Sequence, residues 1–226
     1  MGGAFDSECE SASKQCFIND KAVKSMNFAR GNVGLALVQV RSEQNAAYQK
    51  DYVFVVGGCA QKHALQKVER YTPRGDLWTT MPDLSTARIS PSAIAILDYL
   101  YVFGGKNQTG YLKSIERLNL KNATKFEGID VQMNEGCTDT GLVPMMQSAN
   151  SCEIMILGGF NGKNSLNHRH KFIVANSCSP FACSDGSQGA TTDHLMENVT
   201  SQGDQMRPDF FTGCTMFTSE IMKDGK

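Results

Sequence analysis

The sequence predicts an all-β fold built from successive four-stranded units. Three apolar segments end in a double glycine, namely YVFVVGG at Gly57 and Gly58, YVFGG at Gly104 and Gly105, and IMILGG at Gly158 and Gly159. The first glycines of these pairs are separated by 47 and then 54 residues. Eleven residues after each second glycine stand Glu69, Glu116 and His170. Short apolar segments at even spacing, separated by turn residues, are typical of all-β repeats rather than helices.

Each unit is expected to contain four strands, and the middle unit shows them most clearly. PSAIAIL, residues 91–97, is the first strand, and YLYVF follows the turn at Asp98 as the second. The glycines after it carry no Cβ atom, so they allow positive φ angles and close approach of another chain segment. A polar loop leads to a third strand in SIERLNL. The fourth strand carries an aromatic residue, Phe126 here and Trp78 in the preceding unit.

One stretch of the sequence resembles a known repeat. VVGGCAQKHALQKVERYTPRGDLWTTMPDLSTAR contains, in order, a double glycine, Glu-Arg-Tyr, tryptophan, Met-Pro and Ala-Arg. This order is similar to the kelch repeat, a unit of about 50 residues that forms one propeller blade. The resemblance covers about residues 26–174, and the third unit departs from it because His-Lys-Phe replaces Glu-Arg-aromatic. It implies a kelch-type β-propeller, as in BTB-kelch adaptors and cytoskeletal kelch proteins.

This pattern divides the chain into a tail and a partial propeller. Residues 1–25 are the N-terminal tail, in which QCFIN is a candidate edge strand, and residues 26–226 are the kelch propeller segment. The expected blades span about 26–81, 82–135 and 136–205, with a partial blade at 206–226. Propellers generally contain four to eight blades, so these blades do not close a ring. The chain is a piece of a longer polypeptide, or two copies share one ring, or another chain caps the ends; undetected degenerate blades are the remaining alternative.

Residues that recur from unit to unit are expected to be structural. Stacked blades require repetition at a fixed register, so we assign these residues to ion pairs between blades, loop anchoring and packing. A binding stripe is the alternative interpretation. Besides the six glycines, the set comprises Glu69, Arg70, Tyr71, Trp78, Arg88, Glu116 and Arg117.

Residues that differ between units are the candidates for binding, because loops usually carry the binding function of a propeller. The loops that follow the double glycines are expected to project to one face. Their polar, mildly basic side chains suit an acidic or polar peptide, and solvated loops without a partner are the alternative. The candidates are Gln61, Lys62, His63, Lys106, Asn107, Gln108, Asn161, Lys163 and Asn164.

Composition and charge argue against several classes of function. The 226 residues carry a formal net charge of −1, which gives no reason to expect a nucleic-acid or anionic membrane partner. No segment approaches the roughly 18 apolar residues of a membrane span. The eight cysteines contain no C-x-x-C pair, so we expect no zinc site and free thiols in a reducing compartment.

No catalytic residue, cofactor or metal is expected. Nucleophile and phosphate-loop motifs are absent from the sequence, and His168 and His170 are interpreted as strand residues. The sequence therefore predicts a non-catalytic kelch module for protein interaction or scaffolding, located in the cytoplasm and within a cytoskeletal or ciliary assembly. Its expected partners are other protein chains, a second copy among them. One alternative is the substrate-recognition propeller of a ubiquitin-ligase adaptor, and a weaker one is a galactose-oxidase-like enzyme.

Overall fold

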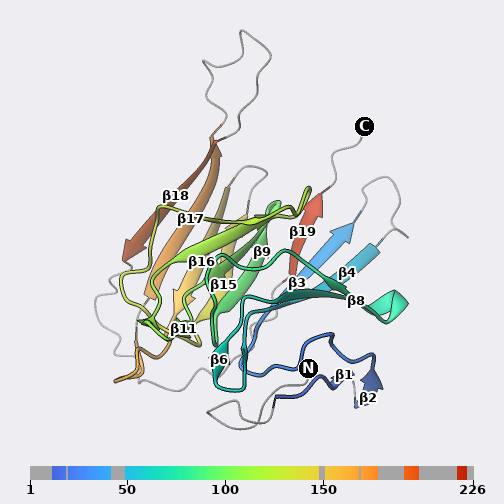
Figure 1. Cartoon of the computed structure of the whole chain (residues 1–226). Helices are drawn as coiled ribbons and strands as arrows, with labels where there is room; N and C mark the ends of the chain where they lie inside the picture. The colour runs from blue at the N-terminus through green and yellow to red at the C-terminus, as the bar shows by residue number, and fades with distance from the viewer. Residues whose placement is uncertain are drawn as a thin grey trace.

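Three sheets form the core of the molecule, and the four antiparallel strands that each of them contains are called blades 1, 2 and 3 (Figure 1). The computed structural model describes residues 12–18, 20–41, 49–147, 151–167, 169–177, 191–198 and 218–222. Within each blade the strands are adjacent in their order along the sequence. The prediction of an all-β segment with about three four-stranded blades is confirmed.

The strands of the blades are the following. Blade 1 contains β3 (Gly34–Arg41), β4 (Gln49–Val56), β7 (Val68–Thr72) and β8 (Leu77–Thr80). Blade 2 contains β9 (Ser92–Ile96), β10 (Tyr99–Phe103), β13 (Ile115–Asn119) and β14 (Phe126–Gly128). Blade 3 contains β15 (Gly141–Gln147), β16 (Ser151–Leu157), β17 (Arg169–Ser177) and β18 (Thr191–Asn198). A 3-10 turn, η1 (Pro73–Gly75), joins β7 to β8.

The inner strands read as continuous apolar runs because both of their faces are buried. Side chains alternate between the two faces of a strand. In β9, Ala93 and Ala95 therefore belong to the apolar layer shared with blade 1, whereas Ile94 and Ile96 belong to the layer shared with blade 3. This is why β9 and β10 of blade 2 show no alternation of polar and apolar residues.

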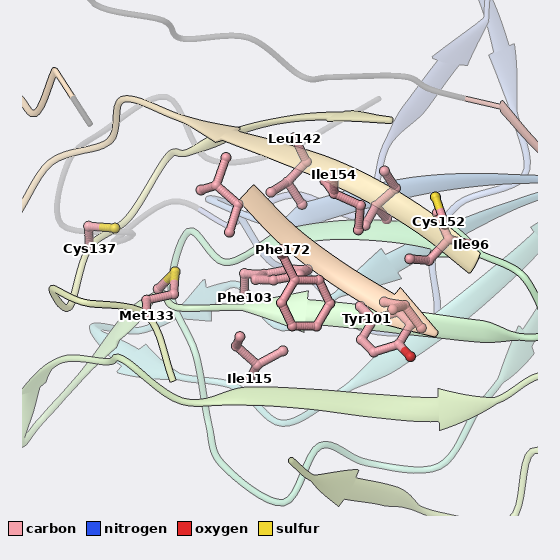
Figure 2. Close-up of a cluster of buried hydrophobic side chains, with 13 residues drawn as sticks. Ile96, Tyr101, Phe103, Ile115, Met133, Cys137, Leu142, Cys152, Ile154 and Phe172 are labelled. Atoms are coloured by element: carbon pink, nitrogen blue, oxygen red, sulfur yellow. The ribbon is translucent and has the colours of Figure 1, made fainter. Parts of the chain in front are cut away.

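Aromatic rings fill the layer between blades 2 and 3. Figure 2 shows Tyr101 and Phe103 of blade 2 beside Phe172 of blade 3. The ring centroids of Phe103 and Phe172 lie 5.1 Å apart with the planes almost perpendicular, an edge-to-face arrangement that aromatic pairs favour. All three side chains are buried. The layer fixes blade 3 against blade 2.

Two further strand pairings lie at the ends of the chain. The N-terminal hairpin consists of β1 (Cys16–Ile18) and β2 (Lys21–Val23), and it lies within the region predicted as a tail. Near the C-terminus, β19 (Thr218–Met222) pairs in parallel with β3 of blade 1. Most of the expected partial blade at 206–226 lies outside the described residues, and its described part joins the sheet of blade 1.

Candidate partner-binding face

One end of the blades carries the loops that follow the double glycines, and we call it the loop face. It consists of the hairpin β5 (Cys59–Ala60) and β6 (His63–Ala64), the hairpin β11 (Lys106–Asn107) and β12 (Gly110–Tyr111), and the turn 160–165. β6 and β11 are neighbours in space. The expectation that these loops share one face follows directly from the strand order, since each loop joins the second and third strands of its blade.

Each loop is held to the connection that leads into its blade by a pair of backbone hydrogen bonds. Cys59 exchanges them with Gly31 at 2.8 and 2.9 Å, and Lys106 exchanges them with Ile89 at 2.9 and 2.8 Å. In the third unit Thr138 and Phe160 do the same at 3.0 Å. The loops are therefore fixed to the frame at their bases.

The double glycines lie where neighbouring connections cross the blade. The amide of Gly58 donates to the carbonyl of Arg88, and that of Gly105 donates to the carbonyl of Cys137. Gly57 has a φ of 60°, and a Cβ atom there would lie 2.5 Å from the Arg88 carbonyl oxygen. Glycine is required here both for its left-handed backbone and for this close approach.

Buried ion pairs hold the base of the loop face. The Arg30 guanidinium lies 2.6 Å from the Glu69 carboxylate and also donates to the carbonyls of Gly57 and Lys67. Both side chains are fully buried. Glu69 in turn accepts the amide of Asn27 at 2.8 Å. Removing either partner would leave an uncompensated charge in the interior.

The same arrangement recurs one unit later. The Nε of Arg88 lies 2.8 Å from Glu116, and its Nη1 donates to the carbonyls of Gly104 and Ser114. Glu116 accepts the amide of Ser85 at 2.7 Å. Burial lowers the pKa of Arg88, and the attraction of Glu116 opposes this shift.

In the third unit both members of this pair are replaced. Cys137 stands four residues after Met133, as Arg88 stands four after Leu84, and His170 stands opposite Ile156, as Glu116 stands opposite Val102. Each site is therefore occupied by a residue with no permanent charge. The sequence showed the replacement by His170, and the structure shows that Cys137 occupies the position of the arginine in the same site.

The first loop presents its candidate side chains to solvent. Gln61 and Lys62 both have positive φ angles, 49° and 65°, which matches the two-residue turns that favour tight hairpins. Gln61, Lys62 and His63 are all exposed. This loop therefore offers a compact polar and basic surface.

The second loop uses one of its candidates for its own structure. The Oδ1 of Asn107 accepts the amide of Thr109 at 2.9 Å and its hydroxyl at 2.7 Å. Lys106 is held by its backbone and is half-buried, whereas Gln108 is exposed. Gln108 is thus the candidate in this loop that is most open to a partner.

The third loop follows the same pattern. The Oδ1 of Asn161 accepts the amides of Lys163 at 2.9 Å and Asn164 at 2.8 Å, so this side chain shapes the turn. Lys163 and Asn164 are exposed. The ring of Phe160 lies 6.1 Å from that of Tyr111, which joins this loop to the second one.

The remaining repeat residues lie away from the loop face. The guanidinium groups of Arg70 and Arg117 lie over the rings of Tyr52 and Tyr99, at 4.7 and 4.5 Å from the centroids. The rings of Tyr71 and Trp78 lie 4.9 Å apart in the layer that faces the N-terminal hairpin.

Thiols and metals add no further site in the described part of the chain. Cys16, Cys137 and Cys152 are free and buried. Cys59 is disulfide-bonded, so the expectation of free thiols throughout is wrong at this position. Among the described residues, no group of three His, Cys, Asp or Glu side chains could hold a metal ion.

The same part of the chain has no helix that is long and apolar enough to cross a membrane.

Comparison with known proteins shows a local similarity of this chain to kelch-repeat proteins. The Kelch motif matches residues 41–85. The chain is 29% identical over 85 residues to Kelch-like protein 38 of Rattus norvegicus, 35% over 66 residues to Kelch-like protein 4 of Homo sapiens, and 32% over 89 residues to Kelch-like protein 15 of Homo sapiens. These matches cover 37%, 29% and 37% of the chain but only 14%, 9% and 15% of the relatives.

A solved structure shares the fold. The structure of YjhT matches 81% of this chain with a TM-score of 0.50 and 11% sequence identity. The chain covers 56% of the length of that protein. At this identity the likeness concerns the arrangement of the blades alone.

Proposed function

We propose that this kelch-repeat protein is a non-catalytic module that binds other protein chains through its loop face. The main support for the proposal is the difference between the bases of the loops, which are fixed to the blades, and their tips, which are exposed. The bases of the loops are fixed by paired backbone bonds and, in the first two units, by buried ion pairs. Their tips expose different polar side chains in each unit. A rigid frame lowers the ordering cost of binding, and variable tips provide selectivity.

The charge of the tips indicates the class of partner. Lys62 and Lys163 are exposed on the first and third loops, and His63 and Gln108 add polar groups near them. An acidic or polar peptide suits this surface, because complementary charge speeds association and fixes orientation. The Kelch-like relatives support a role in protein interaction.

Charge reversal on the loop face tests the proposal. The full chain carrying Lys62→Glu and Lys163→Glu is compared with the unaltered chain in affinity purification from the native source, followed by mass spectrometry. We expect one or more protein partners to be lost from the variant. The matched control is Lys121→Glu with Lys125→Glu, two exposed lysines in the connection at the opposite end of blade 2.

Retention of the same partners by all three proteins would contradict the use of this face. The identity of the partners tests the finer proposals in the same experiment. We propose a scaffold in a cytoskeletal or ciliary assembly of the cytoplasm, for which structural proteins of such an assembly are expected. Recovery of ubiquitin-ligase subunits would instead favour substrate recognition, the role suggested by the likeness to Kelch-like proteins.

A further inference from the structure

The N-terminal hairpin lies against blade 1 in the same way as β7 and β8 of blade 1 lie against blade 2. We call the third and fourth strands of a blade its outer half and the first and second strands its inner half. The amide of Met26 donates to the carbonyl of Lys14 at 2.9 Å, and the amide of Leu84 donates to that of Gln66 at 2.8 Å. Four residues later in each case stands the arginine that enters the following blade. The segment 14–30 is therefore equivalent to 66–88, which contains β7 and β8.

Interactions with the glutamates support this equivalence. Glu69 of blade 1 accepts the amides of Asn27 and Phe28, which follow the hairpin, at 2.8 and 3.4 Å. Glu116 of blade 2 accepts the amides of Ser85 and Thr86, which follow β8, at 2.7 and 3.3 Å. In this comparison β1 is a third strand and β2 is a fourth strand. The first and second strands of the same unit have no counterpart among the described residues.

Burial across blade 1 shows where these two strands are missing. On its face toward the hairpin, Tyr71 and Trp78 of the outer strands are buried, at 2% and 6% exposure. Leu35 and Val53 of the inner strands, on the same face, are only partly buried. Their equivalents in blade 3, Leu142 and Ile154, are covered by the inner strands of blade 2 and are 2% and 0% exposed. Val55, on the same face, is 1% exposed, so the open apolar surface lies at Leu35 and Val53.

The edge of β1 adds a second observation at the same place. Among the described residues, β1 pairs only with β2, so its other edge has no strand beside it. Phe17 and Ile18 of this strand are 48% and 38% exposed, among the large apolar side chains most open to solvent. An unpaired strand edge beside an open apolar surface is a site for an added strand.

We propose that the hairpin β1–β2 is the outer half of a fourth blade, and that a β-hairpin from a different polypeptide supplies the inner half. The second strand of this partner pairs with β1, and its apolar face covers Leu35 and Val53. Its two strands end in a double glycine whose second amide donates to the carbonyl of Arg30, as Gly58 donates to Arg88. This site is distinct from the loop face, so its failure would leave the proposed function intact.

The described part of the chain cannot supply this partner. Each of its inner strand pairs, β3–β4, β9–β10 and β15–β16, is already paired with the outer strands of its own blade, so a second copy has none to spare. β19 is hydrogen-bonded to β3 in the sheet of blade 1.

A peptide with the sequence of residues 91–105, PSAIAILDYLYVFGG, is the probe, with lysines added at both ends for solubility. In the folded protein this segment covers Leu142 and Ile154, the equivalents of Leu35 and Val53. The labelled peptide is titrated into the full chain by fluorescence anisotropy. We expect saturable binding, together with hydrogen exchange at Cys16–Ile18 that is slowed at least about tenfold.

Substitutions locate the binding site. Leu35→Asp is expected to weaken binding by at least about tenfold, because a charge would be buried against the peptide. Leu35→Ala adds no charge and is expected to weaken peptide binding several-fold. This variant replaces Leu35→Asp in the test if Leu35→Asp does not fold. Met145→Asp is the matched control, since Met145 is 54% exposed on blade 3, and it should leave binding unchanged.

Three outcomes would overturn the proposal. They are an absence of binding, unchanged exchange in β1 when the peptide is bound, and equal affinity for the Leu35 variants and the Met145 control. Self-association of the unaltered chain that Leu35→Ala abolishes would also overturn it, because the occupant would then be a second copy.

Discussion

At the scale of single residues, two glycines with the same backbone conformation lie in different surroundings. Gly57 and Gly158 have φ angles of 60° and 62°, so alanine would suffer similar backbone strain at both. A Cβ at Gly57 would lie 2.5 Å from the Arg88 carbonyl oxygen, whereas at Gly158 the nearest atom is the Leu166 carbonyl oxygen at 3.5 Å. Alanine substitutions at the two positions therefore separate the cost of backbone strain from the cost of steric crowding.

We therefore expect Gly57→Ala to destabilise the protein more than Gly158→Ala. The left-handed backbone costs alanine about 1–2 kcal/mol at either site, and crowding adds about 1–3 kcal/mol at Gly57. Urea unfolding of both variants measures the difference in the free energy of unfolding. Equal losses would mean that the carbonyl of Arg88 moves away without cost.

The buried ion pairs give a second residue-scale prediction. Arg88→Met leaves the Glu116 carboxylate buried without its charged partner, and we expect a loss of about 3–5 kcal/mol. The double variant Arg88→Met with Glu116→Leu removes both charges and is expected to lose much less. Chemical denaturation of the single and double variants gives the coupling energy, and additive losses would argue against the pair acting as a unit.

The free thiols of Cys137 and Cys152, between blades 2 and 3, give a third residue-scale prediction. Burial raises the pKa of Cys137 to about 12 and that of Cys152 to about 11. Their stabilising contribution is present below the unfolded-state pKa of about 8.5 and declines as the pH rises above it, because unfolding then permits ionisation. We expect both thiols to resist iodoacetamide at pH 8 in the folded protein and to react after unfolding, with mass spectrometry as the measurement.

At the scale of elements, the N-terminal hairpin is attached by a few polar contacts. The Nε1 of Trp78 donates to the carbonyl of Lys24 at 2.7 Å. Asp76 accepts the amide of Lys24 and the hydroxyl of Tyr71, both at 2.8 Å. The sequence predicted only a candidate edge strand here, because strands of three residues are too short to show a hydrophobic period.

Acid is therefore expected to loosen this hairpin. The amide of Lys24, followed by the hydroxyl of Tyr71, lowers the pKa of Asp76. The contribution of Asp76 to stability is thus present above the unfolded-state pKa of about 3.9 and is lost as the pH falls through its lower folded-state value. Fluorescence of Trp78, the one tryptophan in the sequence, reports the change. In Asp76→Asn this acid-dependent step should be absent; its persistence would assign the step to another group.

At the scale of the whole molecule, the repeated double glycines were sufficient to predict the three blades. The first glycine of each pair has a positive φ, and at Gly57 and Gly104 a Cβ atom would also collide with a carbonyl oxygen of the next connection. The sequence also placed the three variable loops after these glycines. It could not show that Asn107 and Asn161 brace their own loops, since this depends on side-chain geometry in three dimensions. Nor did it reveal the role of Arg30, although the Ala-Arg that recurs at Arg88 was a signal.

The outer face of blade 3 leads to a prediction for the molecule as a whole. Met145 and Leu195 on this blade are 54% and 51% exposed. Exposed apolar side chains promote association, so we expect the average mass in light scattering to rise with protein concentration. Leu195→Lys should reduce this rise, while Lys121→Glu at a distant exposed site should not. A mass independent of concentration in the unaltered chain would contradict the prediction.

The replacement of an ion pair by Cys137 and His170 has a mechanical consequence. The junction of blade 1 with its preceding hairpin and the junction of blades 1 and 2 are each clamped by an arginine that reaches from one unit into the next. At the junction of blades 2 and 3, Cys137 stands in place of the arginine, and the described contacts are apolar packing and hydrogen bonds such as Asn134–His170, Tyr101–His194 and Ser92–Thr140. Under a pulling force, such as a tethered domain experiences, blade 3 should separate first from blade 2. The rest of the protein should then stay folded.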